Sequence, residues 1–189
     1  KKMKTIILSL TLVSILFAAC NNNGSEKAVS DSTASVAVSG EATENKAPAR
    51  EILAGYLKLK NALTNDNDKE AAAIATQLAK AFKAVDKTAL NAEQSQVFTD
   101  VEADAIEHAE HIAANAGDLV HQREHFETLS VEVYELVKAT DAGQKLYYTN
   151  CPMHNNNKGA NWLSETKEIK NPYLGQAMLT CGLVKEELN

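Results

Sequence analysis

The sequence is poor in aromatic residues, glycine and proline, and these shortages limit the fold class. Only 5% of its 189 residues are aromatic, and it contains 8 Gly and 3 Pro. All-β sandwiches and barrels depend on many strand-forming residues and on frequent turns. The composition therefore argues against an all-β fold, although a hydrophobic fraction of 44% is enough to build a core.

The chain also lacks an excess of positive charge. Its 19 Lys and Arg residues are outnumbered by 25 Asp and Glu residues, which gives a formal net charge of −6. A nucleic-acid-binding surface needs basic residues that neutralise phosphates, so the composition argues against this class. The sequence has no glycine-rich phosphate loop, and Ser130 and Ser164 have no evident base at the spacing of a catalytic triad. We therefore expect a protein that is not an enzyme.

The first apolar stretch is short for a membrane span. Lysines occupy positions 1, 2 and 4, an uncharged and mostly apolar stretch covers residues 6–19, and Cys20 follows. A spanning helix needs about 20 apolar residues, whereas this pattern is typical of a secretory signal peptide, here residues 1–19. The run Leu-Phe-Ala-Ala-Cys at 16–20 resembles a lipobox and predicts lipidation of Cys20; the alternative is an ordinary signal peptide. A lipid anchor would hold the protein on the periplasmic side of a bacterial cell envelope.

Residues 20–48 form a second zone of the chain. After Cys20 the sequence is rich in Ser, Ala, Asn, Glu and Gly and has no aromatic residue. Such a composition cannot bury enough apolar surface to order itself. We expect this zone to be a disordered tether that holds the folded part away from the membrane.

Helical periodicity runs through residues 49–140. Apolar residues recur at intervals of three and four in four consecutive segments, as they do in amphipathic helices. Asp66, Asn67 and Asp68 are candidate caps for the second helix, Asp118 can cap the fourth, and Gly117 is a plausible stop for the third. Four such helices with short joints predict an all-α fold, an up-down four-helix bundle.

Residues 141–189 differ in kind from the bundle. They contain both remaining cysteines, two of the three methionines and the only tryptophan. We expect this segment to be a Cys- and Met-containing appendage packed on the bundle. A short terminal helix over residues 176–188 would place Met178 and Cys181 on one face, because they are three residues apart.

The appendage carries a set of soft donor atoms. Cys151, Met153 and His154 lie within four residues of one another, and Met178 and Cys181 follow later. Thiolate and thioether ligands favour Cu(I), whereas zinc normally uses Cys and His without Met, so this set favours Cu(I) or Ag(I). An oxidising compartment would equally allow a Cys151–Cys181 disulfide, which would stabilise the fold by about 3–4 kcal/mol. The residues by themselves leave both alternatives open.

Four of the five histidines form a second candidate ligand set. His108 and His111 are three residues apart, and His121 and His125 are four apart, so each pair shares one face of a helix. An antiparallel hairpin around Gly117 would bring the pairs together near the turn. The alternative is one half-buried histidine with a hydrogen-bonding neighbour and three surface residues.

Six short motifs lie along the second half of the chain. They are His-Gln-Arg-Glu-His-Phe-x-x-Leu-Ser at 121–130, Cys-Pro-Met at 151–153, Trp-Leu-Ser at 162–164, Ile-x-Asn-Pro-Tyr at 169–173, Gly-x-x-Met-Leu at 175–179 and Cys-Gly at 181–182. Together they resemble one bacterial family, a domain of unknown function that occurs as small lipoproteins and also at the C-terminus of periplasmic adaptor (membrane-fusion) subunits of copper and silver efflux pumps. The run Cys-Pro-Met-His at 151–154 is also similar to heavy-metal-binding segments of copper-transporting ATPases, although Asn155 stands where those segments usually have proline.

The resemblance implies a periplasmic heavy-metal-binding module. By motif match it marks Cys151, Met153, Met178 and Cys181 as candidate ligands, and by the narrower match His154. We therefore expect a membrane-anchored metallochaperone or buffer for Cu(I) or Ag(I), linked to metal efflux, whose partner is an efflux adaptor or another subunit of such a system. The alternative function is a disulfide-stapled envelope interaction module without a metal role.

Overall fold

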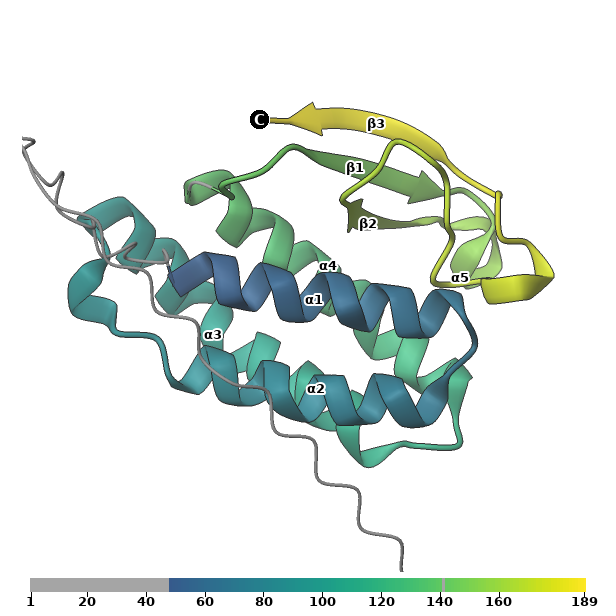
Figure 1. Cartoon of the computed structure of the whole chain (residues 1–189), viewed down its shortest axis with the longest axis horizontal. Helices are drawn as coiled ribbons and strands as arrows, with labels where there is room; N and C mark the ends of the chain where they lie inside the picture. The colour runs from purple at the N-terminus through teal and green to yellow at the C-terminus, as the bar shows by residue number, and fades with distance from the viewer. Residues whose placement is uncertain (1–47, 141) are drawn as a thin grey trace, which may run out of the picture. The chain divides into compact units, whose positions relative to one another are not determined.

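The computed structural model describes residues 48–140 and 142–189 (Figure 1). The expected signal peptide, Cys20 and residues 21–47 of the expected tether lie outside the described residues. Within the part that is described, no helix is both long enough and apolar enough to cross a membrane.

Four long helices pack together, as the periodicity predicts. Each helix packs on the next, and α4 returns to α1. Polar side chains begin three of them: Asn67 accepts from the Glu70 amide, Asn91 forms a capping box with Gln94, and Asp118 accepts from the His121 amide. The helices are α1 (Pro48–Thr64), α2 (Asp68–Lys83), α3 (Ala92–Ala114) and α4 (Leu119–Ala139), with a 3-10 turn, η1 (Lys87–Ala89), between α2 and α3.

The all-α prediction does not describe the C-terminal part, which contains a three-stranded antiparallel sheet. The strands are β1 (Leu146–Cys151), β2 (Ala160–Ser164) and β3 (Leu183–Leu188), in the order β2-β1-β3. The expected terminal helix over residues 176–188 is wrong, because a 3-10 turn, η2 (Gly175–Ala177), is followed by β3. The exposure of β3 alternates along Leu-Val-Lys-Glu-Glu-Leu, which is the period of a strand.

Gly182 is the residue directly before β3. Its φ of +154° lies in the region that favours glycine. A Cβ at this position would lie 2.9 Å from the Asn150 carbonyl oxygen and 2.9 Å from the Trp162 ring. The close approach of the chain here brings the residue before Gly182 next to the end of β1.

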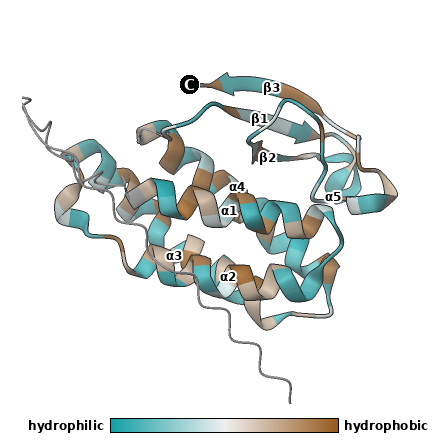
Figure 2. Cartoon of the chain, in the orientation of Figure 1, coloured by the Kyte–Doolittle hydropathy of each residue, from teal (hydrophilic) through white to brown (hydrophobic). Residues whose placement is uncertain are grey.

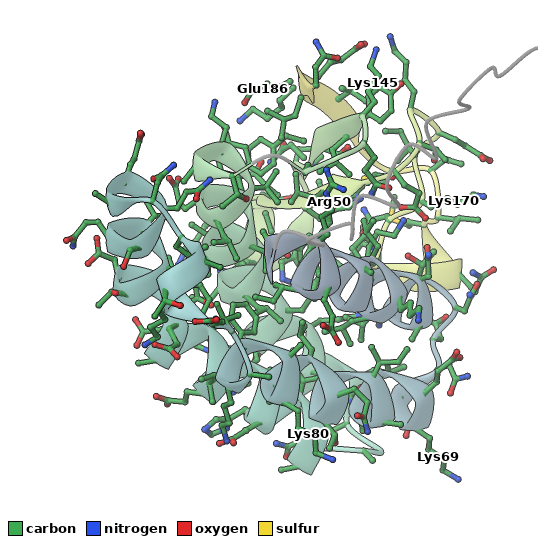
Figure 3. All side chains as sticks on the ribbon, turned by 60° about the vertical axis from the view of Figure 1, so that its left-hand side comes forward. Arg50, Lys69, Lys80, Lys145, Lys170 and Glu186 are labelled. Atoms are coloured by element: carbon green, nitrogen blue, oxygen red, sulfur yellow. The ribbon has the colours of Figure 1, made fainter. Side chains whose placement is uncertain are left out.

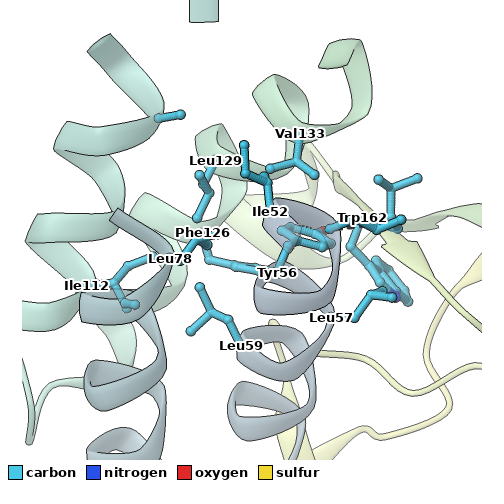
Figure 4. Packing of buried hydrophobic residues seen from close by; sticks show 14 of the residues in the cluster. Ile52, Tyr56, Leu57, Leu59, Leu78, Ile112, Phe126, Leu129, Val133 and Trp162 are labelled. Carbon is cyan, nitrogen blue, oxygen red and sulfur yellow. Dashed lines mark hydrogen bonds between the residues drawn. The ribbon is translucent and has the colours of Figure 1, made fainter. Parts of the chain in front are cut away.

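The sheet shares its core with the bundle. Trp162, Leu163 and Tyr173 are buried in the same cluster as the apolar faces of the helices, and Figure 4 shows Trp162 beside the packed side chains of α1 and α4. Hydropathy colouring shows hydrophobic and hydrophilic residues alternating along the helices (Figure 2). Burial of apolar area contributes about 25 cal/mol per Å², so this shared core stabilises the packing of the sheet on the helices.

Buried polar contacts fix how the sheet docks. The Tyr56 hydroxyl of α1 lies 2.8 Å from Ser130 Oγ of α4 and accepts from the Leu163 amide of β2 at 3.1 Å. Arg123 of α4 donates to the carbonyl oxygens of Pro172 and Leu63, at 2.8 and 2.9 Å. A buried amide without an acceptor costs free energy, so these contacts select one orientation of the sheet.

Charged residues cover the outer edge of the sheet, where Lys145 and Glu186 project from the surface (Figure 3). Glu186 of β3 accepts from the Tyr134 hydroxyl at 2.6 Å and pairs with Lys138 at 3.0 Å. Glu187 pairs with Lys145 at 2.7 Å. Charges on an edge strand discourage pairing with another chain, and the contacts of Glu186 also attach β3 to α4.

Candidate metal sites

Cys151 and Cys181 come together at one end of the sheet. Cys151 is the last residue of β1 and is fully buried, and Cys181 lies two residues before β3 and is half-buried. Both are free thiols, and their side chains are in hydrogen-bonding contact. Burial, followed by the adjacent Cys151 sulfur, raises the pKa of the Cys181 thiol. The contact joins two segments that are 30 residues apart in the sequence.

Backbone contacts hold the two thiols in register. Cys151 pairs with Ala160 in the β1–β2 ladder. On the other side, the Asn171 side-chain amide donates to the Cys181 carbonyl at 2.6 Å, and the Asn171 backbone amide donates to the Leu179 carbonyl at 2.8 Å. The thiol pair therefore belongs to a fixed part of the fold.

The two methionines lie on the surface of the same region. Met153 is 46% exposed and Met178 is 42% exposed. Met153 follows Cys151 by two residues, and Met178 precedes Cys181 by three. Their flexible thioethers are therefore attached to the same two segments as the thiols. The spacing of Met178 and Cys181 does not place them on one helix face, because no helix forms there.

His154 faces a different neighbourhood. It begins the irregular turn α5 (His154–Asn157), stacks on Tyr173 with ring centroids 4.4 Å apart, and lies 3.3 Å from Glu127 of α4. Burial lowers its pKa, and Glu127 opposes that shift. These residues line an open cleft of about 620 Å³ together with Arg123. Within residues 48–140 and 142–189, no cluster of three or more His, Cys, Asp or Glu joins His154 with the two thiols.

The turn that carries His154 is conformationally unusual. The three residues after it, Asn155, Asn156 and Asn157, have φ of 50°, 56° and 64°. Asparagine tolerates this left-handed region better than most residues. Asn155 and Asn156 also line the cleft beside His154.

The four remaining histidines meet between α3 and α4. His108 Nδ1 lies 2.9 Å from His125 Nδ1, and His125 Nε2 lies 3.1 Å from His121 Nε2. The His111 ring stacks on His125 at 4.4 Å. One nitrogen from each of His111, His121 and His125 falls within 4.8 Å of the others, the only such group of three or more His, Cys, Asp or Glu found in residues 48–140 and 142–189.

Burial keeps part of this cluster uncharged. It lowers the pKa of His108, and it lowers the pKa of His125 together with the neighbouring His111, His121 and His108. A histidine whose pKa is lowered is neutral at pH 7, which is the form that binds metals.

Glu132 is a neighbour of the cluster that the sequence reasoning missed. Its Oε1 lies 3.7 Å from His108 Nε2, and its Oε2 is buried with no hydrogen-bond partner among the described residues. Burial, followed by the nearby Asp104 and Glu107, raises the pKa of Glu132 to about 8. The sequence contains one indication of this contact. Glu132 comes seven residues, or about two helical turns, after His125 and therefore lies on the same side of the helix.

One family model matches the chain, the one described as Protein of unknown function (DUF3347), at residues 52–145. No curated protein and no solved structure matches significantly. The matched segment contains α2, α3, α4 and most of α1, with all four clustered histidines, and it ends before Cys151. By this match, residues 52–145 are similar to a family whose function is unknown.

Proposed function

We propose that the protein is a non-catalytic binder of Cu(I) or Ag(I) that holds the ion between Cys151 and Cys181. The observation that supports this proposal is the contact between the two thiols, which come from distant segments of the chain. Soft thiolates favour soft monovalent cations. Met153 and Met178 supply thioethers on the same segments, and His154 is left out of this ligand set because it pairs with Glu127.

The surroundings of the thiols fit a soft cation. Cys151 is fully buried, and Trp162 and Tyr173 are buried in the same apolar cluster. An apolar shell limits the access of water to a bound ion. Because burial and the adjacent Cys151 sulfur raise the pKa of the Cys181 thiol, metal binding to this sulfur would release a proton.

The proposed cellular role is that of a buffer or metallochaperone anchored through Cys20 on the periplasmic side of the envelope. A tether over residues 20–48 would let the folded part reach an efflux adaptor and transfer its metal. Replacement of Cys20 by Ser tests the anchor directly. We expect the variant to move from the membrane fraction to the soluble fraction, and a variant that stays in the membrane would contradict lipid anchoring.

Metal binding is tested by titrating the reduced full chain with Cu(I) against a chromophoric Cu(I) chelator. We expect about one Cu(I) per chain, and we expect Cys151→Ser and Cys181→Ser each to abolish uptake. Cys20→Ser is the matched control, because it removes a cysteine but keeps the pair. Full uptake by both tail variants would refute the thiol site.

The same contact supports a second candidate function. Two adjacent thiols in an oxidising compartment can close a disulfide, and the protein would then be a stapled interaction module of the envelope. A thiol count on protein isolated without reductant separates the two functions. Zero free thiols, combined with no Cu(I) uptake after reduction, would favour the module.

A further inference from the structure

We propose that His111, His121 and His125 form a second metal site, which takes a divalent first-row cation such as Cu(II) or Zn(II). The site lies between α3 and α4 and shares no residue with the thiol pair. A test of this site can therefore succeed or fail whatever the outcome for the proposed Cu(I) function.

The nitrogen positions fit a metal ion. His121 Nε2 and His125 Nε2 are 3.1 Å apart, and one nitrogen of His111 completes a triad within 4.8 Å. Two nitrogens that each lie about 2.0–2.1 Å from a tetrahedral zinc ion are about 3.3 Å apart. The pair is thus within a few tenths of an ångström of the spacing that a shared ion requires.

The outer nitrogen of each ligand faces an acidic group, directly or through one other residue. His121 Nδ1 lies 3.6 Å from Glu124, and His111 Nε2 lies 3.8 Å from Glu107. These contacts leave Nε2 of His121 and Nδ1 of His111 for the ion. Metal-binding histidines commonly direct their second nitrogen to a carboxylate or another acceptor, which fixes the tautomer and increases ligand basicity.

His125 reaches its carboxylate through His108. Its Nδ1 lies 2.9 Å from His108 Nδ1, and His108 Nε2 in turn lies 3.7 Å from Glu132. If His125 Nδ1–H donates to His108 and His108 Nε2–H points to Glu132, the Nε2 lone pair of His125 is free for a metal. His108 and Glu132 are therefore positioning residues, and the buried Glu132 oxygen without a partner lies behind them.

Access and charge at the site also suit a cation. The side chains of His111 and His121 are 47% and 36% exposed, so an ion can enter from solvent. Glu107 lies beside His111 and Glu124 beside His121, which gives the site acidic surroundings that attract a cation. Three neutral imidazoles without a thiolate select borderline divalent cations, with Cu(II) ahead of Zn(II).

The test uses the full chain with Cys20→Ser, Cys151→Ser and Cys181→Ser, so that no thiol can bind the added metal. Zn(II) is titrated against a chromophoric chelator, and Cu(II) is followed by electron paramagnetic resonance. We expect one Zn(II) per chain and nitrogen hyperfine coupling on Cu(II). His121→Gln and His125→Gln each remove a ligand and should weaken binding by about 100-fold or more. Glu132→Gln removes a residue that positions a ligand through His108, and it should weaken binding by about 10-fold.

His154→Gln is the matched control, because His154 is the one histidine outside the cluster and should leave both signals unchanged. His111→Gln should also weaken binding. Because the side chain of His111 is exposed, this replacement should leave the core intact, so weaker binding by this variant cannot be attributed to misfolding. If His111→Gln, His121→Gln and His125→Gln all bind Zn(II) as the parent does, or if bound Cu(II) shows no nitrogen coupling, the site is refuted. Loss of Cu(I) uptake in the cysteine variants has no bearing on this result.

Discussion

Controlled oxidation of Cys151 and Cys181 tests the contact on which the thiol site rests. The two thiols touch in the reduced protein, so a mild oxidant should close one intramolecular disulfide with little movement of the backbone. The Cys20→Ser variant is the material of choice, because it leaves only this pair of cysteines.

The size of the effect follows from the length of the closed loop. The bond would link residues that are 30 positions apart, and the chain-entropy relation gives about 3.7 kcal/mol at 25 °C for a loop of this length. For a folded part of this size, each kcal/mol shifts Tm by about 2–4 °C. We therefore expect oxidation to raise Tm by roughly 7–15 °C.

The assay compares thermal and denaturant unfolding of the oxidised and reduced forms, with a thiol count to verify each state. Addition of a reductant should reverse the gain, and the oxidised form should no longer take up Cu(I), because the thiolate ligands are consumed. A gain below about 1 kcal/mol, or a loss of stability, would show that the two sulfurs do not reach bonding geometry. That result would also weaken the case for a shared metal ion.

Three further substitutions test other parts of the structure. Tyr56→Phe should destabilise the fold by about 1–3 kcal/mol in urea unfolding, because it leaves the buried Leu163 amide without its acceptor. Gly182→Ala should lower both Tm and Cu(I) affinity, since a Cβ 2.9 Å from two neighbours must displace the residues beside Cys181. Glu132→Gln should be tested across pH: because the pKa of Glu132 is raised from 4.5 to about 8 in the folded protein, the wild type should lose stability as the pH rises through this range, whereas the variant should not. Equal pH dependence of the two proteins would contradict a buried Glu132.

The bundle could be predicted from the sequence because its signals are local. Apolar stripes with a period of 3.6 and polar caps such as Asn67 and Asp118 specify each helix within a few residues. The pairing of His108 and His111 with His121 and His125 follows from the same helical spacing and a short turn. Which nitrogens face one another depends on side-chain rotamers and tertiary packing, and the sequence does not encode these locally.

The sheet was missed because its strands depend on distant partners. β3 has a polar, Lys- and Glu-rich sequence that also suits a helix. It becomes a strand through pairing with β1 and through the close approach of the chain at Gly182. Glu132 was missed for a related reason. A carboxylate within an apolar stripe looks like a surface residue until the packing of α3 on α4 shows that it is buried.

The motif at residues 121–130 gains a physical explanation from the three faces of α4. His121 and His125, one turn apart, face the histidines of α3. Phe126 and Ser130 face the core, where Ser130 contacts Tyr56, and Arg123 faces the C-terminal part through the Pro172 carbonyl. One helix therefore supports the histidine site on one side and the docking of the thiol-bearing sheet on another. Because the two sites use different faces, a substitution can disable either one while the other stays intact, and this allows the two metal proposals to be tested separately in one protein.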